Sequence, residues 1–362
     1  MKLDRTTTTL MKGYGILFIA LHNFLHVGSL TGFIKENENT FDVQRTWDYF
    51  DVLRTFEWSD IGQFFSFLGW IGVPVFLFVS GYGLVKKYED SSVTFKVRQY
   101  MYHSWRKLFL LLLPAAIYAV VLSFVIGDWK TVIPMKVLQL TMLNNLLVPM
   151  IKFSPGSYWY FSLTFELYLL YLLVRCWNVR QLMMLLGVVI LIQVVTVILC
   201  GADSGVWSWV RHNFTGWAQV FLIGVIMAKT NIEDCLPQKT IVQWILAAIC
   251  LVSLPLLLLS KWTWLLLVPF VALLFFVSLA GAVSKTKVLK AVGLWLGTYS
   301  SFIFVVHPIA RGLVKMLNNH IGFSLWWLTF AYVILFIIGA IVYKPIYNWL
   351  MNLKISNSCK LK

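Results

Sequence analysis

Residues 108–127 have the sequence LFLLLLPAAIYAVVLSFVIG, which contains no Asp, Glu, Lys or Arg. A helix needs about 20 mostly apolar residues to cross the hydrocarbon core of a bilayer. In lipid the backbone must satisfy its own hydrogen bonds, so such a run predicts a transmembrane helix. The same criterion predicts about ten such helices, near residues 13–34, 61–85, 108–127, 157–174, 181–200, 212–228, 240–260, 262–284, 291–312 and 322–345.

The composition of the whole chain agrees with this interpretation. Of the 362 residues, 59% are hydrophobic and only 12% are charged, against about 25% charged residues in an ordinary soluble domain. The five cysteines are scattered without a CxxC pair or a metal-ligand spacing, so we expect no disulfide framework and no bound metal. We therefore predict one all-α integral membrane domain over residues 1–362, with no soluble enzyme domain and no nucleotide-binding loop.

The basic residues predict the orientation of the chain. The formal net charge is +15, from 30 Lys and Arg against 15 Asp and Glu. With ten helices both termini lie on one side, and that side would carry 20 of the 30 basic residues. Because cytoplasmic loops are enriched in Lys and Arg, we predict that both termini are cytoplasmic. Topology thus accounts for the basic charge, and no nucleic-acid partner is expected.

Polar residues inside the predicted helices are candidates for function, since they are costly in lipid. His22 and His26 are four residues apart and share a helix face, with Asn23 beside them and Lys12 toward the cytoplasmic end. Glu166 is the one carboxylate within the ten segments. Each of these groups could instead form hydrogen bonds that hold helices together, so both interpretations stay open.

Two further segments carry polar side chains. Ser300 and His307 share a face of the ninth predicted helix, and Arg311 follows one turn later. Ser80 lies in a Ser-Gly-x-Gly stretch at the end of the second helix. Helix packing alone also explains such a stretch.

Taken in order, these segments resemble the membrane-bound acyltransferase-3 family over residues 10–348. No single motif is specific, but four occur in the family's order and spacing. They are Lys12-Gly13-x-Gly15-Ile16-Leu17 leading to a His, Phe76-x-Phe78-x-Ser80-Gly81-Tyr82-Gly83, Tyr158-Trp159-Tyr160-Phe161 with Glu166 and Tyr168, and Leu296-Gly297-Thr298-Tyr299-Ser300 with His307-Pro308. The family has a His ten intervening residues after a basic residue; Asn23 stands there, so His22 and His26 both remain candidates.

The resemblance implies transfer of an acetyl or longer acyl group from acetyl-CoA, as co-substrate, to a hydroxyl of a cell-surface or lipid-linked glycan in a bacterial inner membrane. A His suits the role of base near neutral pH, so His22 or His26 is expected to act as the base or to carry the acetyl group transiently, with Glu166 orienting it. Donors for the oxyanion or contacts to the substrate are expected from Asn23, Ser80, Tyr299, Ser300, His307 and Arg311. The phosphates of the coenzyme are expected at Lys12, Lys96, Arg98, Arg106 and Lys107.

Two other classes of protein fit parts of the pattern. A transporter or flippase of a glycan or small molecule would also bury Glu and His, and prolines near the spans would suit broken helices, but no inverted repeat is visible. A glycan polymerase or ligase would need a larger, Arg-rich outer loop than residues 35–60 provide. The sequence leaves the oligomeric state open.

Overall fold

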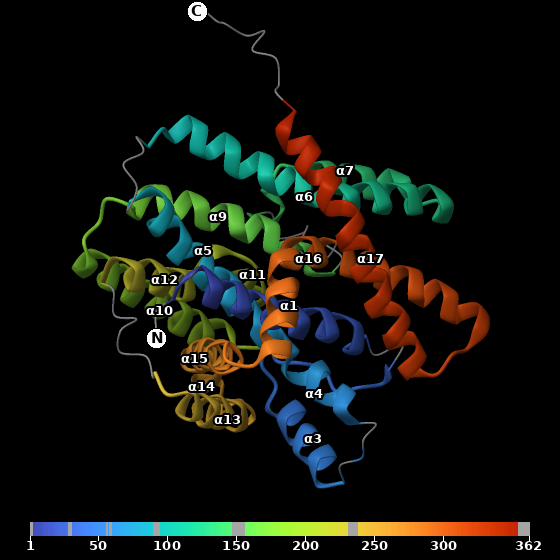
Figure 1. Ribbon diagram of the computed structural model, residues 1–362, viewed down its shortest axis with the longest axis horizontal. Coiled ribbons are helices and arrows are strands. Elements are labelled where there is room, and N and C mark those ends of the chain that lie inside the picture. Colours follow the sequence, from blue (N-terminus) through green and yellow to red (C-terminus); the bar gives the residue numbers. More distant parts are fainter. Residues whose placement is uncertain are drawn as a thin grey trace, which may run out of the picture.

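The computed structural model describes residues 3–27, 31–55, 57, 60–89, 95–146, 156–230 and 238–353. Within these ranges the chain is helical and contains no strand. The α-helices, labelled as in Figure 1, are α1 (Arg5–Leu25), α3 (Val43–Arg54), α4 (Ile61–Leu68), α5 (Val73–Tyr88), α6 (Val97–Ile126), α7 (Trp129–Leu140), α9 (Trp159–Val174), α10 (Val179–Cys200), α11 (Gly205–His212), α12 (Ala218–Thr230), α13 (Thr240–Leu257), α14 (Lys261–Leu266), α15 (Val268–Val283), α16 (Lys287–Ile321) and α17 (Leu325–Asn352). Short 3₁₀ turns include η2 (Gly69–Gly72), η4 (Gly156–Tyr158) and η5 (Phe214–Gly216).

Six helical segments in the described part of the chain are long and apolar enough to cross a membrane. Helices α9, α12 and α15 are apolar but have only 16, 13 and 16 residues. The chain is therefore a helical, multi-pass membrane protein, while ten crossings and cytoplasmic termini stay predictions. The six segments are Ile61–Tyr88, Val97–Ile126, Val179–Cys200, Thr240–Leu257, Lys287–Asn318 and Leu325–Asn352.

The helix predicted over 13–34 begins and ends earlier. Asp4 caps its N-terminus by accepting a hydrogen bond from the Thr7 amide at 2.7 Å, as expected of an N-cap, and the helix ends at Leu25. Further along, Ser66 donates a hydrogen bond to the Ile34 carbonyl at 2.9 Å. The end of the apolar run thus leaves the helix and folds back onto α4.

Three other predicted helices are interrupted or shorter. The segment 61–85 bends through η2, because Gly69 and Gly72 touch the backbone of α1 too closely for any side chain. The segment 262–284 breaks between α14 and α15, where Pro269 stands at the start of the second helix. The helix expected over 212–228 begins only at residue 218, after the turn η5.

Helix α1 lies at the centre of the molecule and makes its most extensive contact with α16. Glycines allow the two backbones to meet: a Cβ atom at Gly13 would lie 2.0 Å from the Gly293 carbonyl oxygen, and one at Gly297 would lie 2.0 Å from that of Thr9. Small residues at helix contacts are a common device in membranes. Glycines of two of the family-like motifs therefore pack α1 against α16.

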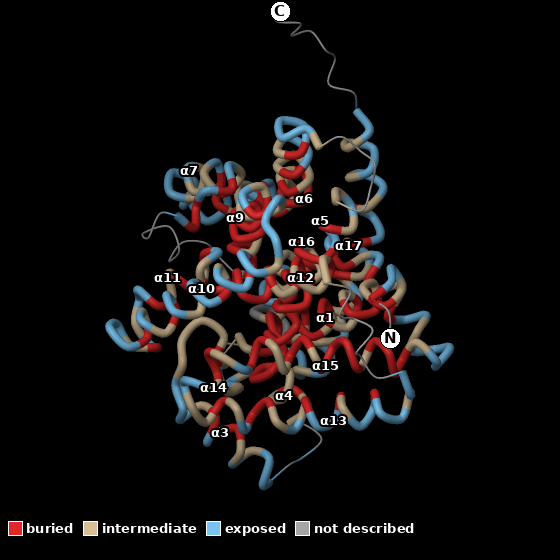
Figure 2. The backbone as a smooth tube through the Cα atoms, turned by 90° about the vertical axis from the view of Figure 1, so that its left-hand side faces the viewer, coloured by how far each residue is buried: buried red, intermediate tan, exposed pale blue. Residues whose placement is uncertain are grey.

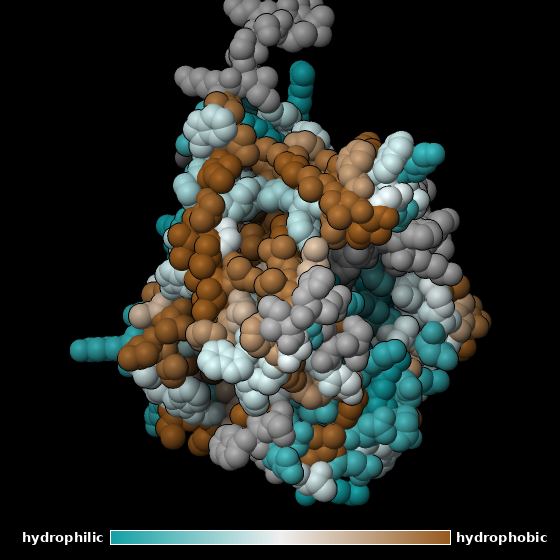
Figure 3. Space-filling model, turned by 90° about the vertical axis from the view of Figure 1, so that its right-hand side faces the viewer, coloured by the Kyte–Doolittle hydropathy of each residue, from teal (hydrophilic) through white to brown (hydrophobic). Residues whose placement is uncertain are grey.

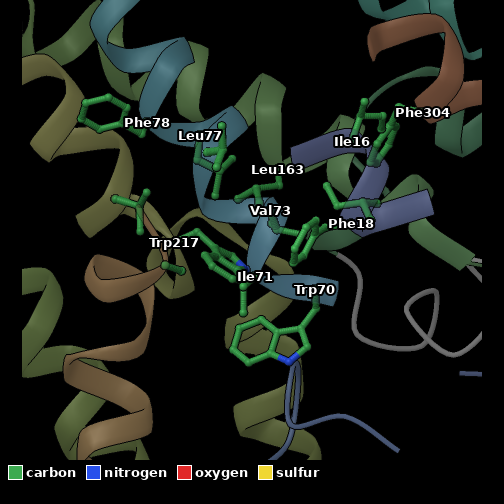
Figure 4. Close-up of a cluster of buried hydrophobic side chains, with 14 of the residues drawn as sticks. Ile16, Phe18, Trp70, Ile71, Val73, Leu77, Phe78, Leu163, Trp217 and Phe304 are labelled. Atoms are coloured by element: carbon green, nitrogen blue, oxygen red, sulfur yellow. The ribbon is translucent and has the colours of Figure 1, made fainter. Parts of the chain in front are cut away.

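Buried residues concentrate around α1, α12 and α15, and exposed ones lie on the outer helices (Figure 2). Trp70, Ile71 and Val73, at the bend between α4 and α5, pack between Phe18 of α1 and Trp217 (Figure 4). One outer face is hydrophobic over much of its upper half, and hydrophilic side chains gather toward the bottom, where α3 lies (Figure 3). The bend between α4 and α5 is thus packed in the core of the bundle, next to the polar residues of α1.

Candidate active site

A polar cavity of about 270 Å³ lies beside α1. His22, Asn23 and His26 line it from α1, and Glu36 and Glu38 line it from the segment that follows. We call it the histidine cavity. Its other lining residues are Ile19, Asn39, Trp70, Val73, Ser157, Trp159, Tyr160, His212, Phe304 and Arg311.

The hydrogen bonds of the two histidines fix their tautomers. Nδ1 of His22 lies 2.9 Å from the Ser66 carbonyl oxygen, and Nδ1 of His26 lies 2.9 Å from the His22 carbonyl oxygen. A carbonyl oxygen can only accept, so each Nδ1 carries the proton and donates it. The rings stack with their centroids 4.6 Å apart. In the neutral histidines both Nε2 atoms therefore keep a lone pair, which can accept a proton or bind a metal.

Glu36 supplies the carboxylate of this group. One ligand atom each from His22, His26 and Glu36 lie within 4.8 Å of one another. Burial raises the pKa of Glu36, but the neighbouring imidazoles of His22 and His26 outweigh this and hold it below its usual value. Two imidazoles and a carboxylate form a donor set that suits a divalent cation such as zinc. The same geometry lets the carboxylate stabilise an imidazolium.

Sequence reasoning missed Glu36 and selected Glu166. One oxygen of Glu166 accepts a hydrogen bond from the Phe214 amide at 2.8 Å, and the residue lines neither this cavity nor the second one described below. Within the described part of the chain, Glu166 forms no hydrogen bond with either histidine. Glu36 lies outside every predicted helix, and its only signal was the acidic character of residues 35–60.

Arg311 and His307 approach the histidine cavity from α16. Arg311 lines the histidine cavity and donates a hydrogen bond to the Asn23 carbonyl at 2.7 Å. Nε2 of His307 lies 3.2 Å from Oγ of Ser157, which lines the cavity while His307 does not. The structure thus brings Arg311 to the cavity directly and His307 only through Ser157.

The expected oxyanion donors also divide into one residue that lines the histidine cavity and others that do not. Asn23 lines the histidine cavity, and its amide also donates to the Ile19 carbonyl at 3.0 Å. The Ser300 hydroxyl donates to the Gly297 carbonyl of its own helix at 2.8 Å, and Tyr299 stacks on a neighbouring Trp of α16. Neither residue lines the histidine cavity or the second cavity described below. Successive helical residues point about 100° apart, which is why Ser301 reaches a cavity when its neighbours do not.

A second cavity, of about 310 Å³, carries positive charge. Lys12, Lys87, His103 and Lys107 line it, and we call it the basic cavity. It lies toward the end of the bundle that is predicted to be cytoplasmic. Its other lining residues are Phe76, Val79, Ser80, Gly83, Leu84, Tyr88, Ser104, Leu108, Leu111, Tyr160, Phe161, Thr164, Tyr168, Ser301 and Phe304.

Of the five cations predicted to bind the coenzyme, only Lys12 and Lys107 line this cavity. Lys96 and Arg98 are exposed at the start of α6 and do not line it. Arg106 instead donates hydrogen bonds to the Leu350 and Leu353 carbonyls at 2.8 and 3.0 Å, at the end of α17. The position of each cation around α6 explains which of them line the cavity. His103 and Lys107 are one helical turn apart and lie on the same face of the helix.

The two cavities meet at one pair of aromatic rings. Tyr160 of α9 and Phe304 of α16 line both cavities, and their ring centroids are 5.0 Å apart. Ser80 and Thr164 lie on the basic side of the pair, and Ser157 lies on the other. The basic cavity and the histidine cavity are therefore neighbours on either side of these two rings.

The fold and these cavities define a multi-pass helical membrane protein with a polar cavity in its interior. A family model described as an acyltransferase domain, acyltransferase-3, matches residues 8–344, and the chain belongs to that family. The resemblance drawn from the four motifs is thereby confirmed, and membrane acyl transfer is the class of activity. Neither a curated protein nor a solved structure matches the chain significantly.

Proposed function

We propose that this protein moves an acetyl group from acetyl-CoA to a hydroxyl of a cell-surface or lipid-linked glycan, in a bacterial inner membrane with both termini cytoplasmic. The observation that best supports the proposal is the contact of two unlike cavities at Tyr160 and Phe304. One cavity offers cations for a phosphorylated donor. The other offers bases and polar groups for an alcohol.

The basic cavity suits the donor. Phosphate groups favour Lys and other cations as partners, and Lys12, Lys107 and His103 face the same space. The side chains deeper in this cavity include Phe76, Leu111 and the Tyr160–Phe304 pair, which suit the acyl-pantetheine arm. The thioester would then lie at the aromatic pair, next to the histidine cavity.

The proposed transfer step uses the lone pair on Nε2 of His22 or His26. Nε2 of His22 or His26 takes the proton of the sugar hydroxyl as its oxygen attacks the thioester carbonyl carbon. The carbon–oxygen bond forms, the carbon–sulfur bond breaks, and the thiolate of CoA leaves and is protonated. Glu36 stabilises the imidazolium that forms in between. Asn23 and Arg311 are the nearby donors for negative charge.

The proposal is tested with membranes that contain the protein, ¹⁴C-acetyl-CoA and a glycan acceptor. We expect label to appear in the glycan and to disappear in the His22→Ala/His26→Ala double variant at equal protein levels. Wild-type label transfer in both single variants and in the double variant would contradict the assignment of the base.

A transporter or flippase is the second candidate, because two cavities separated by one aromatic pair also suit access from alternate sides. The same membranes distinguish the two. Substrate flux into vesicles without any acetylated product supports transport, and acetylated product supports the transferase.

A further inference from the structure

A third cavity, of about 260 Å³, lies between α6, α7 and α16 and serves no role in the transfer step as proposed. Ala115, Ala119, Leu122 and Ile126 of α6 form its apolar wall. Ile126 is 69% exposed, and α6 is one of the segments apolar enough to span the membrane. We call this cavity the lateral groove, since its α6 wall continues onto the lipid-facing surface of that helix. Its other lining residues are Tyr118, Ser123, Asp128, Val132, Met135, Lys136, Tyr158, Pro308, Ile309 and Arg311.

The inner part of the groove carries two cations. Lys136 of α7 is only 4% exposed, and among the described residues its partners are the Gln139 side-chain oxygen at 2.8 Å and the Tyr158 ring. Arg311 also lines the groove, and its one hydrogen bond in that part of the chain goes to the Asn23 carbonyl. Neither cation forms an ion pair with any carboxylate that the structure describes. Lys136 is buried and Arg311 is half-buried. Since buried charges are normally paired, the two cations together favour a bound anion.

A third polar group points to the same conclusion. The Tyr118 hydroxyl is buried and has no hydrogen-bond partner within the described ranges. It lines the lateral groove together with Lys136 and Arg311. Buried hydroxyls almost always have a partner. An anion with several acceptor oxygens would satisfy the hydroxyl and both cations at once.

The groove also adjoins the reaction site. Arg311 lines both the lateral groove and the histidine cavity. Neighbouring residues of η4 face the two spaces, since Ser157 lines the histidine cavity and Tyr158 lines the groove. An anion beside Arg311 would therefore place whatever is attached to it next to His22 and His26.

We propose that the lateral groove holds the phosphate and the first part of the hydrocarbon chain of a lipid-linked acceptor, with the phosphate at Lys136, Arg311 and Tyr118 and its sugar in the histidine cavity. This inference rests on the proposed function and narrows its acceptor to a lipid phosphate that carries a sugar. It follows that the hydroxyl that receives the acetyl group belongs to a sugar close to the phosphate. The hydrocarbon chain lies along Ala115, Ala119 and Ile126 toward the bilayer.

Binding of a probe tests this directly on the purified full-length protein in nanodiscs of neutral lipid. The probes are a fluorescent C20 isoprenyl phosphate and the matching isoprenol, which lacks the phosphate. We expect Lys136→Met to weaken binding of the phosphate probe about 10- to 100-fold, the usual worth of a charge-assisted hydrogen bond, and Tyr118→Phe to weaken it less. Binding of the isoprenol should be weak and equal in all variants.

The chain offers matched controls. Lys130 lies on the same helix but is exposed and stands over the Trp129 ring, so Lys130→Met should bind the phosphate probe like the wild type. Lys136→Arg keeps the charge and should restore most of the affinity. A thermal unfolding curve of each variant in the nanodisc identifies loss of fold.

Two outcomes overturn the proposal. Equal binding of the phosphate probe to wild type and Lys136→Met excludes the phosphate site, and equally strong competition by phosphatidylglycerol identifies a site for ordinary anionic lipid instead. Failure of the proposed function is a separate result: the wild type would then transfer no acetyl group to any acceptor, whatever the probe does. If both proposals hold, Lys136→Met should lose transfer to a lipid-linked sugar and keep acetyl-CoA binding.

Discussion

The basic cavity and the histidine cavity have similar volumes but opposite chemistry. The first is lined by Lys12, Lys87 and Lys107 and contains no carboxylate among its described lining residues. The second combines His22 and His26 with Glu36 and Glu38. Only Tyr160 and Phe304 line both. In the proposed function, this difference would keep a highly charged donor apart from the acceptor and still bring their reacting groups within reach.

Removal of both histidines should have the largest effect. The double variant His22→Ala/His26→Ala removes the base, and general base catalysis typically contributes about 10²–10⁴-fold. We expect acetyl transfer to fall by that factor while acetyl-CoA binding stays within about twofold of the wild type. Rates and equilibrium binding are measured on the same purified protein. Loss of binding together with transfer would mean that the two cavities do not act separately.

Removal of one positive charge from the basic cavity should weaken the binding of acetyl-CoA and leave the chemical step nearly unchanged. We expect Lys107→Met to raise KM for acetyl-CoA about 10- to 100-fold, the worth of one charge-assisted contact to phosphate, with a much smaller change in kcat. Arg98 is exposed on the same helix, outside the cavity, and Arg98→Met should change KM less than about twofold. Arg180→Met, on exposed α10, serves as the general control for lost positive charge. An equal effect of all three variants would favour a diffuse electrostatic role.

Zinc should inhibit acetyl transfer by binding in the histidine cavity and not in the basic cavity. The ligand atoms of His22, His26 and Glu36 lie within 4.8 Å of one another, so Zn²⁺ should bind there and block the base. We expect micromolar Zn²⁺ to inhibit transfer reversibly, and Glu36→Gln to raise the inhibitory concentration by about tenfold, in line with the sensitivity of metal sites to their ligand environment.

The control for this experiment is Asp48→Asn, which changes an exposed carboxylate of α3. Cys176 and Cys200 are free and exposed, and thiolates are zinc ligands in general, so the measurement uses a protein with serine at both positions. Unchanged zinc sensitivity of Glu36→Gln would mean that the carboxylate does not contact the ion.

The smallest expected effect concerns stability against pH. Burial, and then the charge of Glu36, raise the pKa of Glu38 to about 8, although Arg211 opposes this. The folded protein therefore favours the protonated carboxyl. Its contribution to stability is complete below the pKa of the unfolded chain and is lost as the pH rises to about 8. We expect Glu38→Gln to unfold at a temperature roughly 2–4 °C higher than the wild type at pH 9, and at nearly the same temperature at pH 5. A pH-independent difference would contradict the assigned pKa.

The sequence by itself determined the class of the protein and the order of its helices. Charge-free runs are local, so they mark segments such as 108–127 without knowledge of any neighbour. The polar residues on α1 were also visible, because His22 and His26 share a face whatever surrounds them. The four motifs then identified the family, which the match over residues 8–344 confirms.

The sequence could not show which carboxylate meets the histidines. Glu166 stood out because it lies inside an apolar run, yet its helix turns it to the Phe214 amide. Glu36 looked like an ordinary loop residue until the chain after α1 folded back on α4 and brought it beside His22. Such a contact forms only because the chain reverses direction, so no local periodicity in the sequence predicts it.

Only the tertiary structure decided which cations and hydroxyls share a space. Lys107 and Arg98 both carry a positive charge, but Lys107 lines a cavity together with Lys12 and Arg98 is exposed outside it. The bend at Gly69 and Gly72 likewise depends on contact with α1, which hydropathy cannot register. Hydropathy measures the preference of each residue for lipid or water, whereas a reaction site depends on which residues contact one another. That is settled by the packing of helices that are distant in sequence.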